Sequence, residues 1–468
     1  MSPRRQLDTT IDLSSPRRVH VVGVGGPGMS PIAFVLKGLG HDVSGSDMKM
    51  SPVIDSLRGA GVAVAIGHNK ENVVGADVVT FSTAIPPDNS ELLAARENGA
   101  VVCHRSTVLA ALCSATDSIA VAGTHGKTTT SALLSRILIE NGDDPSCIVG
   151  GDVPEFGSGA RVGAGTHLVL EADESDGTLD VLSPSHLLIT NVDVDHLDYF
   201  GSFADVQRSF ADAARRTRGC VVVNADDERS DPVRKALSGV DAAVTFGRSD
   251  SADMQIHEVE STPAGTRFTL SFRGETHSFE IPLRGVHNAM NCAAAVAMAA
   301  QFGVSLEASS RAVSTFRGVG RRFTERGIHE GTTFIDDYAH LPAEIEAALD
   351  AARSHPNLTG RVVAVFQPNR FHRIAAMSDA YAHCFTRADW VVITDVYASG
   401  TEPIDGVTGK LVVDAVRSAH PESTVVWAKE RSDVVREVLA YVRPGDICVS
   451  MGCGDIETFP DDVMAATS

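Results

Sequence analysis

The sequence has no excess of positive charge and no long apolar run. Among its 468 residues, 60 are Asp or Glu and 40 are Lys or Arg, so the formal net charge is −20. This balance argues against a nucleic-acid partner, because binding to a phosphate backbone needs a basic surface. No run of about 18 apolar residues occurs, so we expect no membrane-spanning segment and no membrane partner.

Cysteine is scarce and carries no metal-site spacing. The eight cysteines form no CxxC pair, and several lie in apolar contexts such as GCVVVN and DICVSM. Reduced, buried thiols in a cytoplasmic enzyme are therefore expected. Residues 1–17 contain basic residues but no apolar segment behind them, which is typical of a flexible tail and not of a secretory signal.

The chain is too long for one compact core, and its length suggests about three domains. Short β-branched runs alternate with amphipathic stretches in three blocks, a pattern that indicates parallel α/β sheets. Residues 250–283 differ, because short alternating strands without a helix predict a small antiparallel insertion. We predict domains at residues 18–113, 114–324 and 325–468.

The stretch HVVGVGGPGMS, residues 20–30, ends a predicted strand in the glycines 23, 25, 26 and 28. Such a loop lets the backbone of a helix N-terminus approach a diphosphate. Asp47 follows the second predicted strand, where a dinucleotide enzyme places its ribose-binding acid. Alone, this block would suit an NAD-dependent dehydrogenase.

A second glycine loop, VAGTHGKTTT at residues 121–130, also follows a strand and opens a helix. Its backbone amides would hold phosphates, Lys127 would add a positive charge, and the Thr128 hydroxyl would reach a magnesium ion. Val121 departs from the usual first glycine of this motif. The alternative is an ordinary capped turn between a strand and a helix.

Carboxylates follow the next two predicted strands, in LEADESDG (residues 170–177) and TNVDVDH (residues 190–196). The ends of parallel strands share one sheet edge with the phosphate loop, so these carboxylates could hold a metal ion there. The alternative is a solvated loop. Likewise, HNAMN puts Asn288 and Asn291 on one helix face, where they could bind a ligand or simply cap the helix.

The motifs GTHGKTTT, EADESDG, TNVDVDH, GVHNAMN, FRGVGRRF, DDYAHLPAEI and FQPNRFHR together resemble the Mur ligase family, the amide-forming enzymes of peptidoglycan precursors. The resemblance covers essentially the whole chain after the tail. It implies a Rossmann-like N-terminal domain, a central P-loop-type ATPase domain with a small antiparallel insertion, and a C-terminal Rossmann-like α/β domain.

The resemblance also implies a reaction. ATP would phosphorylate a carboxylate, and an amine would then displace the phosphate. The implied substrates are ATP, UDP-N-acetylmuramate and L-alanine, with Mg²⁺ or Mn²⁺ as the metal ion. Residues 191–234 contain no lysine, which disfavours family members that use a carbamylated lysine there. Addition of a tripeptide to the same sugar nucleotide, or a non-catalytic nucleotide-binding scaffold, remains open.

The resemblance further implies site residues, of which Lys127, Glu171, His196 and His340 would be catalytic. The metal ligands would be Thr128, Glu171 and His196. The ATP site would comprise Gly123, Thr124, His125, Gly126, Lys127, Thr128, Thr129, His287, Asn288, Asn291 and Arg322, with Arg321 beside it. The UDP-sugar site would comprise Gly23, Gly25, Gly26, Gly28, Met29, Ser46, Asp47, His68, Ser82, Thr83 and Arg105.

The amino-acid site would comprise Tyr338, His340, Arg370 and Arg373, where a bidentate guanidinium suits a carboxylate. Ala339 and Leu341 depart from the family pattern DDYGHHP, which puts in doubt any role assigned to position 341. The alternative for the two arginines is a solvated helix start. A monomer or a homodimer is expected.

Overall fold

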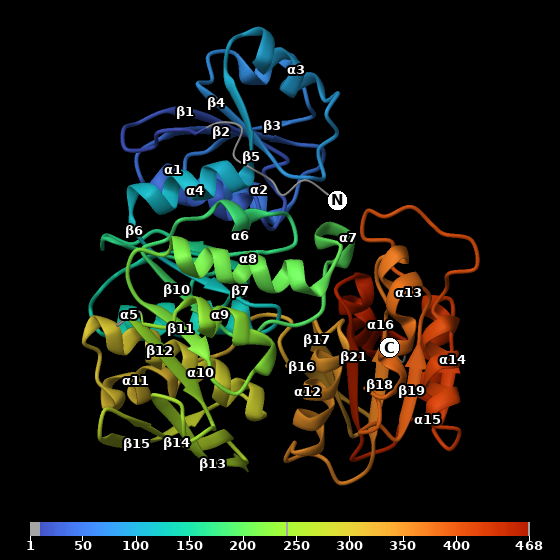
Figure 1. Cartoon of the computed structure of the whole chain (residues 1–468). Coiled ribbons are helices and arrows are strands. Elements are labelled where there is room, and N and C mark those ends of the chain that lie inside the picture. The colour runs from blue at the N-terminus through green and yellow to red at the C-terminus, as the bar shows by residue number, and fades with distance from the viewer. Residues whose placement is uncertain (1–9, 240–241, 467–468) are drawn as a thin grey trace. The chain divides into compact units, whose positions relative to one another are not determined.

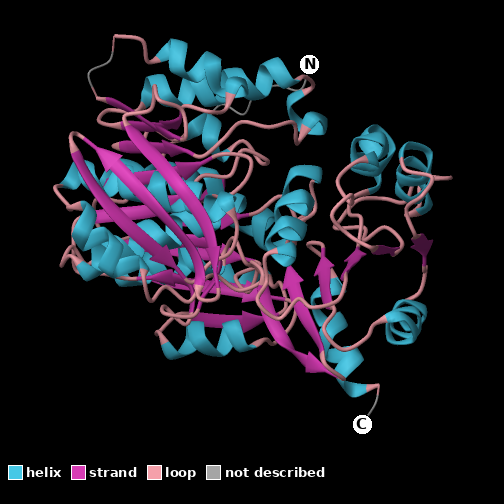
Figure 2. Ribbon diagram, turned by 90° about the horizontal axis from the view of Figure 1, so that it is seen from below, coloured by secondary structure: helices cyan, strands magenta, loops and turns pink. Residues whose placement is uncertain are grey.

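The computed structural model describes residues 10–239 and 242–466. They form two compact units, the first made of 1–258, 268–279 and 290–318 and the second of 259–267, 280–289 and 319–468. Strands alternate with helices in both units (Figure 2). Within the described residues, no helix is long and apolar enough to cross a membrane.

The N-terminal sheet is parallel throughout, with the strand order β3-β2-β1-β4-β5 (Figure 1). This order places the C-terminal end of β1 at the point where the strand order reverses, the usual ligand position in such a sheet. The strands are β1 (Arg18–Val22), β2 (Asp42–Asp47), β3 (Ala63–Ile66), β4 (Val78–Phe81) and β5 (Val101–His104). The helices are α1 (Ser30–Gly38), α2 (Pro52–Gly59), α3 (Ser90–Glu97) and α4 (Arg105–Ala115), with a 3₁₀ turn η1 (Lys70–Val73).

Helix α1 forms because apolar residues recur at a helical spacing and bury one face. Ile32, Val35 and Leu36 are inaccessible to solvent and belong to one core that continues into the central sheet. The predicted flexible tail falls partly on residues 1–9, outside the described residues. Within the remainder, Leu13 is buried and Ile11 packs against the same core, so these apolar side chains attach the segment to the domain.

The central sheet has the order β15-β14-β13-β12-β11-β10-β6-β9-β7-β8. Its strands from β12 to β7 pair in parallel, and β8 closes that edge antiparallel to β7. The strands are β6 (Asp117–Ala122), β7 (Ser146–Val153), β8 (Ser158–Arg161), β9 (His167–Glu171), β10 (His186–Ile189), β11 (Val221–Asn224), β12 (Ala243–Gly247), β13 (Met254–Thr262), β14 (Gly265–Phe272) and β15 (Glu275–Ile281).

Strands β13, β14 and β15 follow one another through two-residue connections, which join antiparallel neighbours. They are the predicted insertion. The helices of this region are α5 (Lys127–Glu140), α6 (Thr178–Val181), α7 (Leu197–Phe200), α8 (Phe203–Arg216), α9 (Asp231–Ala236), α10 (Val286–Ala299) and α11 (Leu306–Val313). The β7–β8 hairpin, which packs against α1, has no counterpart in the sequence-based expectations.

The C-terminal sheet has the order β16-β17-β21-β18-β19-β20, antiparallel only between β16 and β17. Its strands are β16 (Thr324–His329), β17 (Thr332–Asp337), β18 (Val362–Phe366), β19 (Trp390–Ile393), β20 (Val425–Trp427) and β21 (Ile447–Met451). Its helices are α12 (Pro342–Arg353), α13 (Phe371–Met377), α14 (Lys410–Ala419), α15 (Arg431–Tyr441) and α16 (Phe459–Ala465). The predicted three-domain α/β architecture is confirmed.

Candidate active site

The loop between β6 and α5 has the geometry of a phosphate-binding loop. Gly123 and Gly126 adopt φ angles of +133° and +80°, and Gly126 caps α5 in the left-handed conformation. A β-carbon at Gly123 would overlap the Thr190 hydroxyl, and one at Gly126 would overlap the Asn291 side chain. Both positions therefore need glycine. Asn291, a predicted ATP residue, thus lies against this loop.

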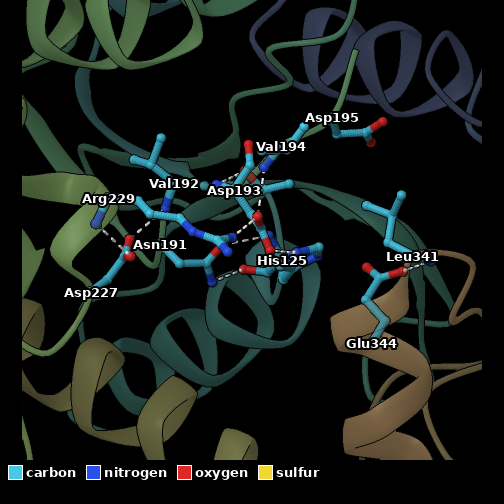
Figure 3. A network of polar contacts seen from close by, with 12 residues as sticks. His125, Asn191, Val192, Asp193, Val194, Asp195, Asp227, Arg229, Leu341 and Glu344 are labelled. Carbon is cyan, nitrogen blue, oxygen red and sulfur yellow. Dashed lines mark hydrogen bonds and ion pairs between the residues drawn. The ribbon is translucent and has the colours of Figure 1, made fainter. Parts of the chain in front are cut away.

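The end of strand β10 supports the same loop (Figure 3). The Asn191 side chain accepts a hydrogen bond from the His125 N–H at 2.9 Å and donates one to the His125 carbonyl at 3.0 Å. The Asp193 N–H donates to Thr124 Oγ1 at 2.8 Å, and His125 Nε2 lies 3.2 Å from Asp193 Oδ2. The predicted ATP residues Thr124 and His125 are therefore hydrogen-bonded by Asn191 and Asp193, to which the sequence analysis assigned no role.

Lys127, the first residue of α5, pairs with the buried carboxylate of Glu174. Its Nζ donates to Glu174 Oε2 at 2.9 Å and to the Gly123 carbonyl at 2.5 Å. Burial would lower the pKa of Lys127, but Glu174 and the neighbouring carboxylates raise it above its usual value. The ammonium group therefore stays charged inside the loop.

The predicted metal residues Thr128 and Glu171 meet directly. Thr128 Oγ1 donates to Glu171 Oε1 at 3.1 Å, while the Gly150 N–H donates to Glu171 Oε2 at 2.7 Å. The next residue, Thr129, is buried in α5. Glu171 ends β9, the neighbour of β6 in the sheet, which is why its carboxylate reaches the start of α5.

His196 follows β10 and has a left-handed backbone, with φ of +52°. Its Nε2 lies 3.0 Å from Asp195 Oδ2. Burial would lower the pKa of His196, but the Asp195 hydrogen bond and the charge of Glu174 raise it. Within the described residues, no three His, Cys, Asp or Glu side chains are arranged to hold a metal ion.

Arg105 links the first glycine loop to the acidic loop that follows β9. Its Nε donates to Asp176 Oδ2 at 2.7 Å, and its Nη2 lies 3.6 Å from Asp173 Oδ2. A β-carbon at Gly28 would overlap Nη1 of the same guanidinium. With Asp176 and Glu174 largely buried, this loop is not merely a solvated strand end.

The first glycine loop is held by the end of β2. The Ser46 carbonyl accepts the N–H groups of Gly23 and Val24 at 2.8 and 2.9 Å. The Asp47 carboxylate accepts the Gly25 N–H at 2.9 Å. The other predicted residues of this site lie in the same loop or at the neighbouring strand ends: Gly26 and the buried Met29 before α1, His68 after β3, and Ser82 and Thr83 after β4.

In the second unit, the predicted amino-acid residues gather with the boundary arginines. The guanidinium groups of Arg321 and Arg322 each lie 5.0 Å from the Tyr338 ring, and Tyr338 packs edge-to-face on His340. His340 Nδ1 lies 3.2 Å from Glu344 Oε2. Arg321 also donates to the Gly452 carbonyl at 2.6 Å, which attaches the loop after β21 to the same place.

Arg370 and Arg373 belong to the start of α13. Arg370 has φ and ψ angles of +62° and +113°, a sparsely populated backbone conformation that costs a non-glycine residue about 1–3 kcal/mol. Arg373 is buried and donates to Asn369 Oδ1 at 2.8 Å, which rules out a solvated helix start for this arginine. Burial raises the pKa of the nearby Cys453 thiol above its usual value, although the positive charges of Arg373 and Arg370 oppose this shift.

Leu341, the departure from the family pattern, is buried, as is Ala339. The Leu341 N–H donates to Glu344 Oε2 at 3.1 Å at the start of α12. Position 341 therefore packs the core and caps a helix in this chain.

The predicted ATP residues His287 and Asn288 also lie in the second unit. Burial lowers the pKa of His287 to about 4, and the Asn288 side chain donates a hydrogen bond to the Arg284 carbonyl at 2.8 Å.

Family models match the chain in three consecutive parts. The Mur ligase family catalytic domain matches residues 18–116, the Mur ligase middle domain matches 121–299, and the glutamate ligase domain of Mur ligases matches 321–454. A UDP-N-acetylmuramate–L-alanine ligase from Sorangium cellulosum is 40% identical over 94% of both chains. The chain belongs to the Mur ligase family.

Two further Mur ligases agree with this assignment. The UDP-N-acetylmuramate–L-alanine ligase of Bradyrhizobium diazoefficiens is 42% identical over 94% of this chain and 95% of its own. The solved structure of the UDP-N-acetylmuramate–alanine ligase of Thermotoga maritima matches with a TM-score of 0.79 and 27% identity, over 96% of this chain and 99% of that one. Family membership decides against the dehydrogenase interpretation of the first loop.

Sequence reasoning missed several polar residues of this Mur ligase that organise the loops. They include Glu174, which pairs with Lys127, Asn191 and Asp193 behind the phosphate loop, and Glu91 beneath the first loop. Glu174 and Asp193 lie in the acidic motifs LEADESDG and TNVDVDH, so their positions after predicted strands could have indicated that they contact the glycine loop. Glu91 carries no such signal, because its partners come from distant segments.

Proposed function

We propose that this Mur ligase joins L-alanine to the carboxylate of UDP-N-acetylmuramate and converts ATP to ADP and phosphate, in the cytoplasm. The observation that supports it best is the set of contacts around the acidic loop in the first unit. Arg105 lies directly against Gly28 of the first glycine loop and donates to Asp176 of the acidic loop, while Glu174 of the same acidic loop pairs with Lys127 in the second glycine loop. Two phosphate-binding loops joined in this way suit a nucleotide-linked substrate and ATP. The substrates are those named for the relatives, which are UDP-N-acetylmuramate–L-alanine ligases.

The reaction needs the substrate carboxylate to become a good acyl group. A carboxylate oxygen attacks the γ-phosphorus of ATP, the bond to ADP breaks, and an acyl phosphate forms. The neutral amine of alanine then attacks the acyl carbon, and phosphate leaves with the bonding electron pair. The nitrogen loses one proton, which the released phosphate takes up, and the amide remains. Such phosphoryl transfer depends mainly on positioning and on neutralising charge.

Each loop residue has a part in this scheme. The Gly126 turn directs the first backbone amides of α5 toward the phosphates. When ATP binds, the Lys127 ammonium group leaves Glu174 and pairs with the phosphates. Thr128 and Glu171 would hold a Mg²⁺ ion, with Mn²⁺ as a substitute and His196 nearby, and the ion would neutralise phosphate charge. Oxygen ligands of this kind fit Mg²⁺, which usually keeps several water ligands and binds one or two carboxylates together with substrate phosphate oxygens.

The amine-side substrate is assigned to the second unit. Arg370 and Arg373 would bind the alanine carboxylate, for which a planar guanidinium is suited. Tyr338 and His340 would border the amine. Because Glu344 Oε2 accepts from the His340 backbone N–H at 2.9 Å and lies close to its ring, it fixes the orientation of this histidine.

A matrix of phosphate-release assays tests the proposal. ATP is combined with each of UDP-N-acetylmuramate, UDP-N-acetylglucosamine and no sugar nucleotide, and each mixture receives L-alanine, glycine, L-serine, the murein tripeptide or no amino acid. Phosphate release that requires UDP-N-acetylmuramate and L-alanine together, with the amide product seen by mass spectrometry, is expected. A preference for the tripeptide would assign the recycling reaction, and phosphate release without an amino acid would refute the ligase assignment.

A further inference from the structure

A buried carboxylate lies beneath the first glycine loop, and no role has been assigned to it so far. Glu91 is the second residue of α3, and its side chain is inaccessible to solvent. Four groups donate hydrogen bonds to it: Ser46 Oγ at 2.6 Å, Asn72 Nδ2 at 2.6 Å, His68 Nδ1 at 3.0 Å and the Asn69 N–H at 3.3 Å. These donors come from β2 and from the continuous stretch of residues 68–72 after β3, so one carboxylate on α3 joins two segments that are distant from it in the sequence.

The carboxylate stays ionised in this position. Burial would raise the pKa of Glu91, but the neighbouring His20 and the hydrogen bonds from Ser46 and Asn72 lower it to about 2. His20 Nε2 is buried 3.8 Å from Glu91 Oε1 and has no hydrogen-bond partner of its own. An ionised carboxylate can only accept hydrogen bonds, so each group that faces it must donate.

This requirement fixes the hydrogens of two predicted UDP-sugar residues. The Ser46 hydroxyl hydrogen is committed to Glu91, so Ser46 Oγ can only accept from His68 Nδ1, and the single Nδ1 hydrogen is shared between Ser46 Oγ and Glu91 Oε2, each 3.0 Å away. The hydrogen of His68 therefore lies on Nδ1, and its other nitrogen, Nε2, is left to accept a hydrogen bond when the ring is neutral. The Ser46 main chain meanwhile holds the N–H groups of Gly23 and Val24.

We propose that Glu91 is the positioning residue of the nucleotide-sugar site. Its buried carboxylate fixes Ser46 beneath the glycine loop and sets the tautomer and orientation with which His68 meets the uridine diphosphate part of the substrate. The inference rests on the proposed function for the identity of that ligand. Glu91 does not touch the reacting atoms, so it acts through its two neighbours.

The test compares Glu91→Gln with the wild-type chain. The glutamine keeps the size of the side chain but replaces one accepting oxygen by an NH₂ donor, so it cannot accept from all four groups. The loss of a hydrogen bond to a charged group predicts a rise of about 10-fold or more in the KM for UDP-N-acetylmuramate. The kcat and the KM values for ATP and L-alanine should change less than about threefold. Glu91→Asp keeps the charge and should recover part of the affinity.

Two control variants on the same helix separate positioning from folding. Glu97→Gln changes an exposed acid and should leave all constants unchanged. Leu92→Ala opens the buried apolar core outside the polar network, so it should lower the melting temperature without a selective change in the KM for the sugar nucleotide. If Glu91→Gln behaves like Leu92→Ala, or raises all three KM values alike, the proposal is wrong.

A spectroscopic measurement tests the same inference without turnover. In ¹⁵N-histidine-labelled protein, with the His68 signals assigned by loss in His68→Gln, the wild-type chain should show the hydrogen on Nδ1. In Glu91→Gln the tautomer should shift toward Nε2. A wild-type His68 with its hydrogen on Nε2 would overturn the proposal even if the ligase activity is present. Conversely, the expected tautomer in a chain that fails the phosphate-release matrix would refute only the proposed function.

Discussion

Removing Lys127 should destabilise the first unit as well as abolish the reaction. Lys127 Nζ lies 2.9 and 3.2 Å from the two oxygens of Glu174, whose residue is only 2% exposed. In Lys127→Met the carboxylate keeps its burial and loses its cation. Breaking such a pair from one side costs about 3 kcal/mol or more. For a unit of about 300 residues, with an unfolding entropy of about 2.1 cal/mol/K per residue, that corresponds to a fall in melting temperature of about 5 °C.

The double variant Lys127→Met/Glu174→Gln distinguishes this cause from a general packing defect. Because both charges are removed together, the double variant should recover most of the decrease in melting temperature seen in Lys127→Met. Scanning calorimetry without ligands measures this difference. ATP-dependent phosphate release should nevertheless stay at least about 100-fold below wild type in both variants, since the donor that neutralises phosphate charge is missing. Lys235→Met, at an exposed lysine of α9 in the same unit, serves as the control and should change neither property.

Two results would refute this reasoning. If the double variant melts no higher than Lys127→Met, the unpaired charge of Glu174 is not the source of the instability. If Lys127→Met keeps phosphate release within about threefold of wild type, Lys127 does not bind the phosphates, and the second glycine loop has lost its assigned role. The two readouts are independent, so each part of the interpretation can fail alone.

Three further predictions concern single positions. Gly126→Ala should reduce phosphate release at least about 10-fold, because the new methyl group needs a strained φ and overlaps Asn291; unchanged kinetics would contradict the loop geometry. Arg373→Lys should raise the KM for L-alanine about 10-fold with little change in the KM for ATP, because a bidentate donor is lost; an equal rise in both would contradict its assignment. The folded-state pKa of Glu91 lies below its ordinary value of 4.5, so its stabilisation is complete above about pH 4.5 and is lost as the pH falls toward 2. In urea unfolding, the stability difference between wild type and Glu91→Gln should therefore shrink by about 1 kcal/mol from pH 6 to pH 4, and a constant difference would contradict an ionised Glu91.

Periodicity and glycine spacing were sufficient to predict the three α/β sheets and the two glycine-rich turns that each join a strand to a helix. The rule that parallel strands end at one sheet edge correctly brought Glu171 to Thr128, although 43 residues separate them. The same rule cannot select one carboxylate among several at that edge. Only the structure shows that Glu174 turns inward to Lys127, whereas Asp176 turns to Arg105 in the N-terminal domain.

The β7–β8 hairpin and the role of Leu341 show where pattern reasoning stops. The hairpin's exposed and buried residues do not alternate cleanly, because its register shifts between Ile148 and Val153. Leu341 was noticed only as a missing histidine, since a single letter cannot show whether a side chain enters a core or a cleft. Its burial is a property of the packing around α12, which local sequence does not encode.

The two glycine loops now differ in a way that their similar sequences hide. The second loop ends in its own cation, Lys127, which is the first residue of α5 and pairs with Glu174. The first loop has no lysine. Its nearby cation is Arg105, which begins α4 directly after the edge strand β5 and lies against Gly28. Asp173 lies close enough to raise the pKa of both Arg105 and Lys127. The acidic loop after β9 therefore supplies negative charge to the cation beside each glycine loop, and a change in the charge of Asp173 should act on both Arg105 and Lys127.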